Sequence, residues 1–158
     1  MKRAIHFLLF GVILLAAFGA VAPSVRANGC TMRDAAGQYG FTLTGVLITP
    51  TGAVPAAAVG RATVDAIGNV TGTEARNVGG GYADETLSGT LTVNPDCTGS
   101  MTLNIYQGGQ LVRTSVLSIV FVNNQQELRM VQKSLTLPNN VSVPAVITVD
   151  AKKTFSDQ

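Results

Sequence analysis

Apolar and polar residues alternate along most of the chain beyond residue 38. Residues 39–44 read Tyr-Gly-Phe-Thr-Leu-Thr, and residues 101–106 read Met-Thr-Leu-Asn-Ile-Tyr. A period of two residues is typical of a β-strand with one face buried and the other in solvent. Further apolar runs complete the set of predicted strands, which covers residues 39–44, 57–65, 70–78, 87–93, 101–106, 111–122, 127–135 and 143–152.

Turn-forming residues separate these runs. The clearest are residues 65–69 (Asp-Ala-Ile-Gly-Asn), 79–81 (three glycines), 94–96 (Asn-Pro-Asp) and 108–109 (two glycines). Strands at this spacing, joined by short hairpin turns, predict an all-β fold, an antiparallel meander of about eight strands. We favour a small closed or nearly closed β-barrel, because closure removes exposed sheet edges. A two-sheet β-sandwich is the alternative.

One stretch resists this interpretation. Residues 45–58 contain Pro50, Gly52, Pro55 and several alanines. This composition predicts a loop that crosses one mouth of the barrel, and long loops are often functional or plain surface connections.

The N-terminus has the pattern of a secretory signal peptide. Lys2 and Arg3 precede an apolar run over residues 7–22, and Val25-Arg26-Ala27 places small residues before a cleavage point. A retained membrane anchor is the competing interpretation, but the run is short for a span of about 20 residues. We therefore expect a signal peptide over residues 1–27, a single β domain over residues 28–151 and a polar tail over residues 152–158.

Removal of the signal peptide changes the charge. Of 11 basic residues, Lys2, Arg3 and Arg26 leave with it, so eight remain against nine acidic ones, and the net charge of +2 becomes −1. We therefore expect no nucleic-acid partner and no membrane span after signal removal. A transmembrane barrel is a weaker alternative, because the aromatic residues do not recur at strand ends as aromatic girdles do.

The absence of histidine from the predicted mature chain narrows the chemistry. His6, the one histidine of the sequence, lies in the signal peptide. This excludes Ser-His and Cys-His nucleophile pairs and histidine metal sites unless a partner supplies the residue. Carboxylate, tyrosine or lysine catalysis stays open, but we favour a protein that is not an enzyme, with no catalytic residues, no metal and no cofactor.

Cys30 and Cys97 are the two cysteines, and an even number in an exported chain predicts a disulfide. Closing a loop of this length is worth roughly 4 kcal/mol in the chain-entropy model. Lipidation of Cys30 is the rival, since Ala27-Asn28-Gly29-Cys30 faintly resembles a lipoprotein box, but Ala27 and Asn28 fit that pattern poorly.

Few polar residues are candidates for a site. Asp84 and Glu85 are adjacent, so on a strand they point to opposite faces and do not form an acid–base pair. Asp65 and Asp96 lie in predicted turns, where an aspartate commonly accepts hydrogen bonds from its own backbone. Arginines within strands could point into a lumen and hold a ligand carboxylate, although such residues face solvent more often. The candidate ligand-binding residues are Tyr39, Arg61, Tyr106, Arg113 and Arg129.

Several short elements carry a resemblance. They are residues 37–41 (Gly-Gln-Tyr-Gly-Phe), 59–65 (Val-Gly-Arg-Ala-Thr-Val-Asp), 68–73 (Gly-Asn-Val-Thr-Gly-Thr) and 89–99, which end in Asp-Cys-Thr-Gly. Over residues 30–105 the chain resembles a group of small uncharacterised exported bacterial proteins. The resemblance implies export and carries no functional residue. By architecture the chain also looks like calycin or allene-oxide-cyclase-type barrels, which is an analogy of fold that establishes no function.

These observations favour a non-enzymatic, disulfide-linked β-barrel in the periplasm or outside the cell that binds a small apolar ligand. The alternative is a structural or surface-interaction protein of the cell envelope, whose partner is another envelope protein. An enzyme, with residues such as Tyr39, Tyr106 or Asp65 converging in the barrel, ranks third.

Overall fold

The computed structural model describes residues 29–154. The predicted signal peptide and the last four residues of the predicted polar tail lie outside the described residues. Within the described part, no helix is long and apolar enough to cross a membrane.

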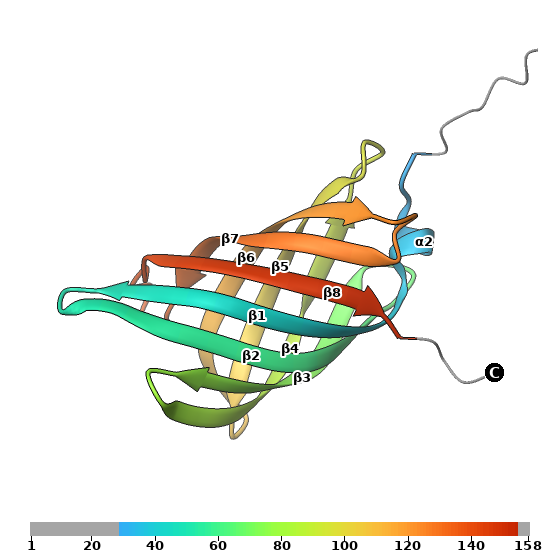
Figure 1. Cartoon of the computed structure of the whole chain (residues 1–158). Helices are drawn as coiled ribbons and strands as arrows, with labels where there is room; N and C mark the ends of the chain where they lie inside the picture. The colour runs from blue at the N-terminus through green and yellow to red at the C-terminus, as the bar shows by residue number, and fades with distance from the viewer. Residues whose placement is uncertain (1–28, 155–158) are drawn as a thin grey trace, which may run out of the picture.

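The described chain is one short helix and eight strands that form a closed antiparallel barrel (Figure 1). Each strand pairs with the next along the chain, and the last strand pairs with the first, so the predicted barrel is confirmed over the sandwich. The elements are α2 (Met32–Ala35), β1 (Gly37–Thr49), β2 (Gly52–Val64), β3 (Asn69–Val78), β4 (Gly81–Val93), β5 (Thr98–Gln107), β6 (Gln110–Val122), β7 (Glu127–Thr136) and β8 (Ala145–Lys153).

The predicted turns form as expected from their residue types. In the β2–β3 turn, Asp65 Oδ1 accepts hydrogen bonds from the backbone N–H groups of Ile67 at 3.0 Å and Asn69 at 2.8 Å. In the β4–β5 turn, Asp96 Oδ1 accepts from the backbone N–H of Thr98 at 3.0 Å. Both aspartates therefore stabilise turns, as predicted.

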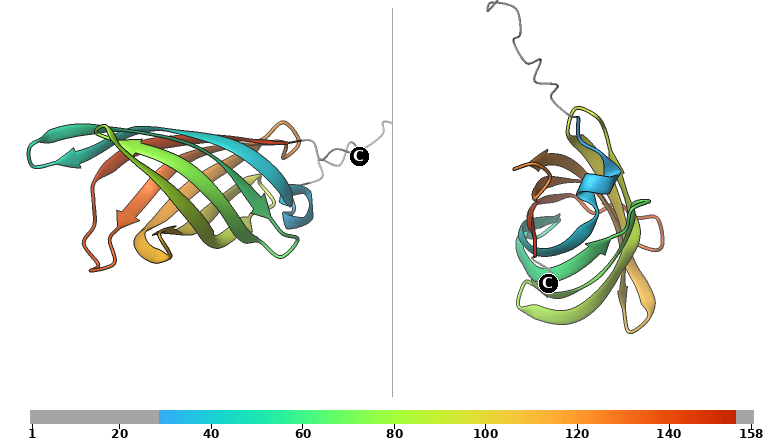
Figure 2. Two further views of the ribbon diagram at one scale, coloured as in Figure 1. Left: turned by 90° about the horizontal axis from the view of Figure 1, so that it is seen from below. Right: turned by 90° about the vertical axis from the view of Figure 1, so that its right-hand side faces the viewer.

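The loop predicted over residues 45–58 is wrong. These residues form the ends of β1 and β2, paired from Gly45↔Ala56 to Thr49↔Gly52, and this hairpin extends beyond the rest of the barrel (Figure 2). Pro55 lies one residue beyond the β2–β3 ladder, whose last pair is Ala56↔Val78, and a missing N–H is tolerated at such a position. Composition indicated a loop, but pairing with neighbouring strands overrides that weak local signal.

The start of the predicted polar tail also belongs to the barrel. Lys152 and Lys153 are part of β8 and pair with Gly40 and Tyr39 of β1. These are the last two pairs of the β1–β8 ladder that closes the barrel, so the β domain extends two residues beyond the predicted boundary at residue 151.

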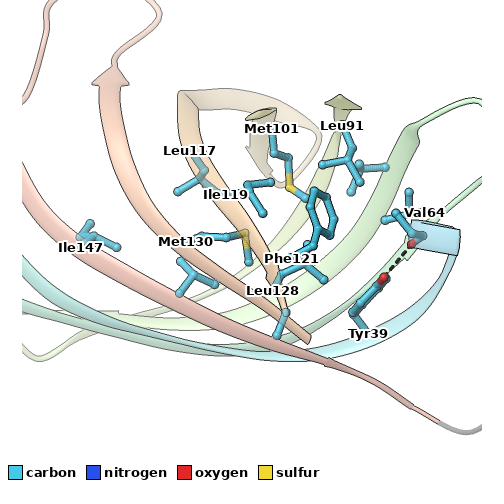
Figure 3. Packing of buried hydrophobic residues seen from close by; sticks show 14 residues of the cluster. Tyr39, Val64, Leu91, Met101, Leu117, Ile119, Phe121, Leu128, Met130 and Ile147 are labelled. Carbon is cyan, nitrogen blue, oxygen red and sulfur yellow. Dashed lines mark hydrogen bonds between the residues drawn. The ribbon is translucent and has the colours of Figure 1, made fainter. Parts of the chain in front are cut away.

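Most of the interior is an apolar core to which inward positions of all eight strands contribute (Figure 3). Phe41 packs across the backbone of Gly60, where an added Cβ would lie 2.5 Å from the ring atom Cζ. A side chain at residue 60 would therefore displace the ring. The most deeply buried members of the core are Ala35, Tyr39, Val64, Val70, Leu91, Leu117, Ile119, Phe121 and Leu128.

Helix α2 lies across one end of the barrel (Figure 2). Ala35 is fully buried, and its carbonyl accepts a 2.6 Å hydrogen bond from the Tyr39 hydroxyl. Two hydrogen bonds join the Gln125 side chain to the backbone of Thr31. The N–H of Thr31 donates to Gln125 Oε1 at 3.0 Å, and Gln125 Nε2 donates to the C=O of Thr31 at 2.7 Å. These neutral hydrogen bonds attach the helix to the barrel end.

The predicted disulfide joins the same end. Cys30 and Cys97 are bonded, with Cα atoms 4.9 Å apart and a sequence separation of 67 residues. The bond connects the segment before α2 to the β4–β5 turn, where the N–H of Cys30 also donates to the C=O of Pro95 at 3.2 Å. The disulfide therefore holds α2 in place across the barrel end.

Candidate functional site

The barrel interior contains a cavity of about 290 Å³. It begins beside Tyr39 near α2 and extends towards the opposite end, where Val78, Leu137 and Val143 line it. Most of its wall is aliphatic or aromatic, because the inward positions of the strands are almost all apolar. Apolar lining with a few placed polar groups is the usual composition of a small-molecule site.

A cluster of four charged side chains lies at one side of the cavity, and we call it the charge cluster: Glu74 and Arg76 of β3, Glu85 of β4 and Arg113 of β6. The cavity wall also contains the uncharged polar residues Ser115 and Gln132. Arg113 donates from Nη1 to Glu85 Oε1 at 2.8 Å and from Nη2 to Glu85 Oε2 at 2.6 Å. Its Nη2 also donates to Glu74 Oε1 at 2.8 Å. Arg76 Nε donates to Glu85 Oε1 at 3.0 Å. Two cations and two carboxylates thus share one side of the interior.

The strand register brings these residues together. Glu74 and Glu85 are directly opposite each other on β3 and β4, and Arg76 is opposite Ala83. Arg113 projects from β6, where it pairs with Ile105 of β5. Residues two apart on one strand share a face, so Glu74 and Arg76 point into the barrel together.

Glu85 is the innermost member of the charge cluster. Its side chain is fully buried, at 0% exposure, and it does not line the cavity. Burial raises the pKa of its carboxyl, but the hydrogen bonds and charge of Arg113, with hydrogen bonds from Glu74 and Arg76, outweigh it and hold the pKa below its usual range. Glu85 is therefore a carboxylate that orients both guanidinium groups, and a buried charge of this kind requires such pairing.

Glu74 has the opposite behaviour and does line the cavity. Burial raises the pKa of its carboxyl to about 7, although the charge of Arg113 opposes the increase. A hydrogen bond with Glu85 and the negative charge of Glu85 raise it further. Like charges at one site are expected to separate in pKa, with one carboxylate ionised and the other holding a proton. The cluster therefore titrates near neutral pH through Glu74.

Two of the predicted ligand-binding residues lie at the cavity. Tyr39 and Arg113 line its wall. The Tyr39 hydroxyl donates a hydrogen bond to the C=O of Ala35 at the α2 end. Burial raises the pKa of Tyr39, so its hydroxyl stays neutral. Arg113 belongs to the charge cluster. A ligand-binding role for either residue stays a prediction.

The other three predicted residues do not line this cavity. Arg61 is exposed on the outer face of β2, because the inward positions of that strand are Ala56, Ala58, Ala62 and Val64. Arg129 is on the outer face of β7, where it pairs with Glu127 at 3.0 Å and Asp150 at 2.8 Å. Tyr106 follows a β-bulge at Ile105/Tyr106 and is half-buried on the outside of the inward row.

Sequence reasoning missed Glu74, Arg76 and the role of Glu85. It correctly placed Asp84 and Glu85 on opposite faces, since Asp84 is exposed and Glu85 is buried. The glycines at residues 79–81 were the signal that could have revealed the rest. A tight hairpin centred there pairs Glu74 with Glu85 across the two strands.

The cluster is not arranged as a metal site. Among residues 29–154, no group of three or more His, Cys, Asp or Glu side chains is placed to hold a metal ion. The arrangement of the interior suits the recognition of a molecule with an apolar body and one polar end.

Comparison with known proteins defines the fold class. A search of known protein families finds no match, and neither does a search of curated proteins. The structure of EF1p2_mFAP2b bound to DFHBI is similar, with a TM-score of 0.54 and 10% identity over 79% of this chain and 100% of that chain. The structure of a redesigned β-barrel, mFAP1, bound to DFHBI, has a TM-score of 0.50 and 14% identity over 78% and 98% of the two chains. At these identities the likeness shows the β-barrel fold alone, and the resemblance to small exported bacterial proteins stays a prediction.

Proposed function

We propose that this protein is an exported, non-enzymatic binding protein that holds one small, mainly apolar molecule inside its barrel. The observation that carries the proposal is the cavity of about 290 Å³, with its apolar wall and a single charge cluster. Sites for small molecules have volumes of roughly 300–1,000 Å³, so this cavity suits a ligand at the small end of that range.

The comparison with solved barrels supports binding of a small molecule. EF1p2_mFAP2b and mFAP1 are both bound to DFHBI, and both share the barrel fold with this chain. A ligand that enters an apolar interior not completely filled by side chains transfers its own apolar surface out of water. This transfer is the main driving force for such binding.

The disulfide supports the exported part of the proposal. Disulfides form and persist in oxidising compartments such as the periplasm and the extracellular space. Cys30 and Cys97 are both within the β domain and are bonded to each other. Together with the predicted signal peptide, this pairing favours a periplasmic or extracellular location.

Titration with a neutral, environment-sensitive dye such as N-phenyl-1-naphthylamine tests the proposal. We expect saturable fluorescence enhancement with one site per chain. In Ala56→Phe the affinity for the dye should fall by about tenfold or more, because the new ring would occupy the cavity beside residue 56. Ala57→Phe is the matched control, because Ala57 is exposed on the outer face of the same strand. Absence of saturable binding, or equal loss in both variants, would overturn the proposal.

A further inference from the structure

The charge cluster has more hydrogen-bond donors than acceptors on its cavity side. A guanidinium carries five N–H groups. Arg76 uses its Nε–H on Glu85, and no group among residues 29–154 accepts a hydrogen bond from its Nη1 or Nη2. Arg76 lines the cavity with 22% of its side chain exposed. Four of its donors thus remain for a bound molecule.

The acceptors of the cluster are mostly occupied. Both oxygens of Glu85 accept from arginine, and Glu74 Oε1 accepts from Arg113 Nη2 at 2.8 Å. The planar edge formed by Nη1 and Nη2 of Arg76 matches an anion with two acceptor oxygens, and such paired bonds are stronger than neutral ones. An acceptor group on the ligand therefore complements the cluster better than a donor group does.

The charge balance points the same way. The titratable groups that face Glu74 are Glu85 from β4, Arg113 from β6 and Arg76 on its own strand, while β2 places Gly60 opposite it. When Glu74 carries its proton, two guanidinium groups face a single carboxylate, so the cluster has a net charge of +1. One anionic group from a ligand would restore neutrality in a site where unbalanced charge is unfavourable.

We propose that the cavity binds an amphipathic molecule with one anionic head group, a carboxylate or sulfonate, seated on the free edge of Arg76, with its apolar body in the aliphatic part of the barrel. This inference rests on the proposed small-molecule function and names the class of ligand.

A second consequence concerns protons. A ligand anion beside Glu74 favours the protonated form of this carboxyl, because it adds a negative charge next to it. Binding therefore takes up a proton, and the affinity for a permanent anion falls as the pH rises through the pKa of Glu74, about 7.

The test compares three ligands with the same ten-carbon chain by calorimetry on the exported protein: decanesulfonate, decanol and decylamine. Decanesulfonate stays ionised throughout the accessible pH range. At pH 6 we expect it to bind about tenfold or more tightly than decanol, and decylamine to bind more weakly than decanol. Between pH 6 and pH 8 its affinity should fall by about tenfold, while that of decanol stays constant.

Two variants and one control locate the effect. Arg76→Gln should weaken decanesulfonate by about tenfold and leave decanol unchanged. Arg61→Gln removes an exposed arginine from the outer face and should change neither. Glu74→Gln imitates the protonated carboxyl, so it should raise decanesulfonate affinity at pH 8 and remove the pH dependence. This last variant keeps the test valid if Arg76→Gln does not fold.

The outcomes separate the two proposals. If decanol and the neutral dye bind but decanesulfonate binds no more tightly, the anionic ligand class is overturned and the binding function stands. If decylamine binds best, the head group is a donor and the inference is also overturned. If neither the dye nor any of the three ligands binds, both proposals are overturned.

Discussion

The α2 end of the barrel and the charge cluster are both polar parts of an apolar interior, but they are built in different ways. At the α2 end, Tyr39, Gln125 and Thr31 form neutral hydrogen bonds that the protein satisfies entirely by itself, and the disulfide holds them there. In the charge cluster, arginine and glutamate side chains bond to one another, and the edge of Arg76 formed by Nη1 and Nη2 keeps free donors at the cavity. The difference is that the polar groups at the α2 end are satisfied within the protein, whereas the charge cluster keeps free donors, to which our proposal assigns a bound molecule.

Breaking the charge cluster should have the largest effect. Arg113→Met removes three hydrogen bonds of the charge cluster. Glu85, at 0% exposure, then has Arg76 as the one cationic partner left in the cluster. We expect the free energy of unfolding at pH 8 to fall by about 3–5 kcal/mol, because an incompletely compensated buried charge is strongly unfavourable. Denaturant titration measures it.

The matched control for this change is on the outside of the barrel. Arg129→Met removes the ion pairs of a half-exposed arginine with Glu127 and Asp150, and ion pairs in contact with solvent contribute little to stability. Equal destabilisation by the two substitutions would show that the interior cluster has no special role in stability.

Removing the disulfide should have the next largest effect, confined to the α2 end. The double variant Cys30→Ser/Cys97→Ser opens a loop with a sequence separation of 67 residues and should lower the free energy of unfolding by about 2–4 kcal/mol. Dye binding should be unchanged under conditions where the variant is folded, because neither cysteine lines the cavity. Loss of dye binding by a folded variant would show that the two regions are coupled.

The smallest predicted effect is the pH dependence of stability that Glu74 imposes. Its pKa rises from 4.5 to about 7 on folding, so between these values the folded chain holds a proton that the unfolded chain has released. Stability should therefore fall as the pH rises through this window, by about 1–3 kcal/mol. Glu85, whose pKa is lowered, acts in the opposite direction and below this window, since its contribution is lost only as the pH falls through its folded pKa.

Comparison of the natural protein with Glu74→Gln measures the contribution of Glu74 to the pH dependence of stability. Denaturant titrations at intervals from pH 4.5 to pH 8 should show a decline in the natural protein that is absent from the variant. A decline of equal size in both proteins would assign the pH dependence to other groups.

The strands and turns could be predicted because they follow from local patterns. A period of two in residues 39–44 and 101–106 indicated inward and outward faces. The inward face is as expected, because residues 39, 41, 43, 101, 103 and 105 all line the cavity. The segment over residues 45–58 could not be predicted, because its prolines, glycines and alanines are poor strand formers. Its structure depends on pairing of the two arms of the hairpin with each other and, for residues 45–47, on pairing with β8, which is distant in sequence.

The candidate site was predictable only in part, for a related reason. Residues 56–58 are three alanines, so β2 shows no alternation that could assign a face to Arg61. The sequence of β6 does not assign a face to Arg113 either, because Arg113 lies opposite a β-bulge at Ile105/Tyr106 that shifts the register. The sequence named both arginines as equal candidates, and one points inward while the other points outward.

The sequence by itself determined the all-β class, the succession of strands and turns and the pairing of the two cysteines, because each depends on short-range pattern or on a count. Only the tertiary structure decided which charged residues share the interior. Strand register controls this choice, and a shift of one residue would turn each side chain of a strand to the opposite face. Glu74, Arg76 and Glu85 meet through the register of the β3–β4 hairpin, and the closed barrel brings Arg113 of β6, which pairs with neither strand, to the same place.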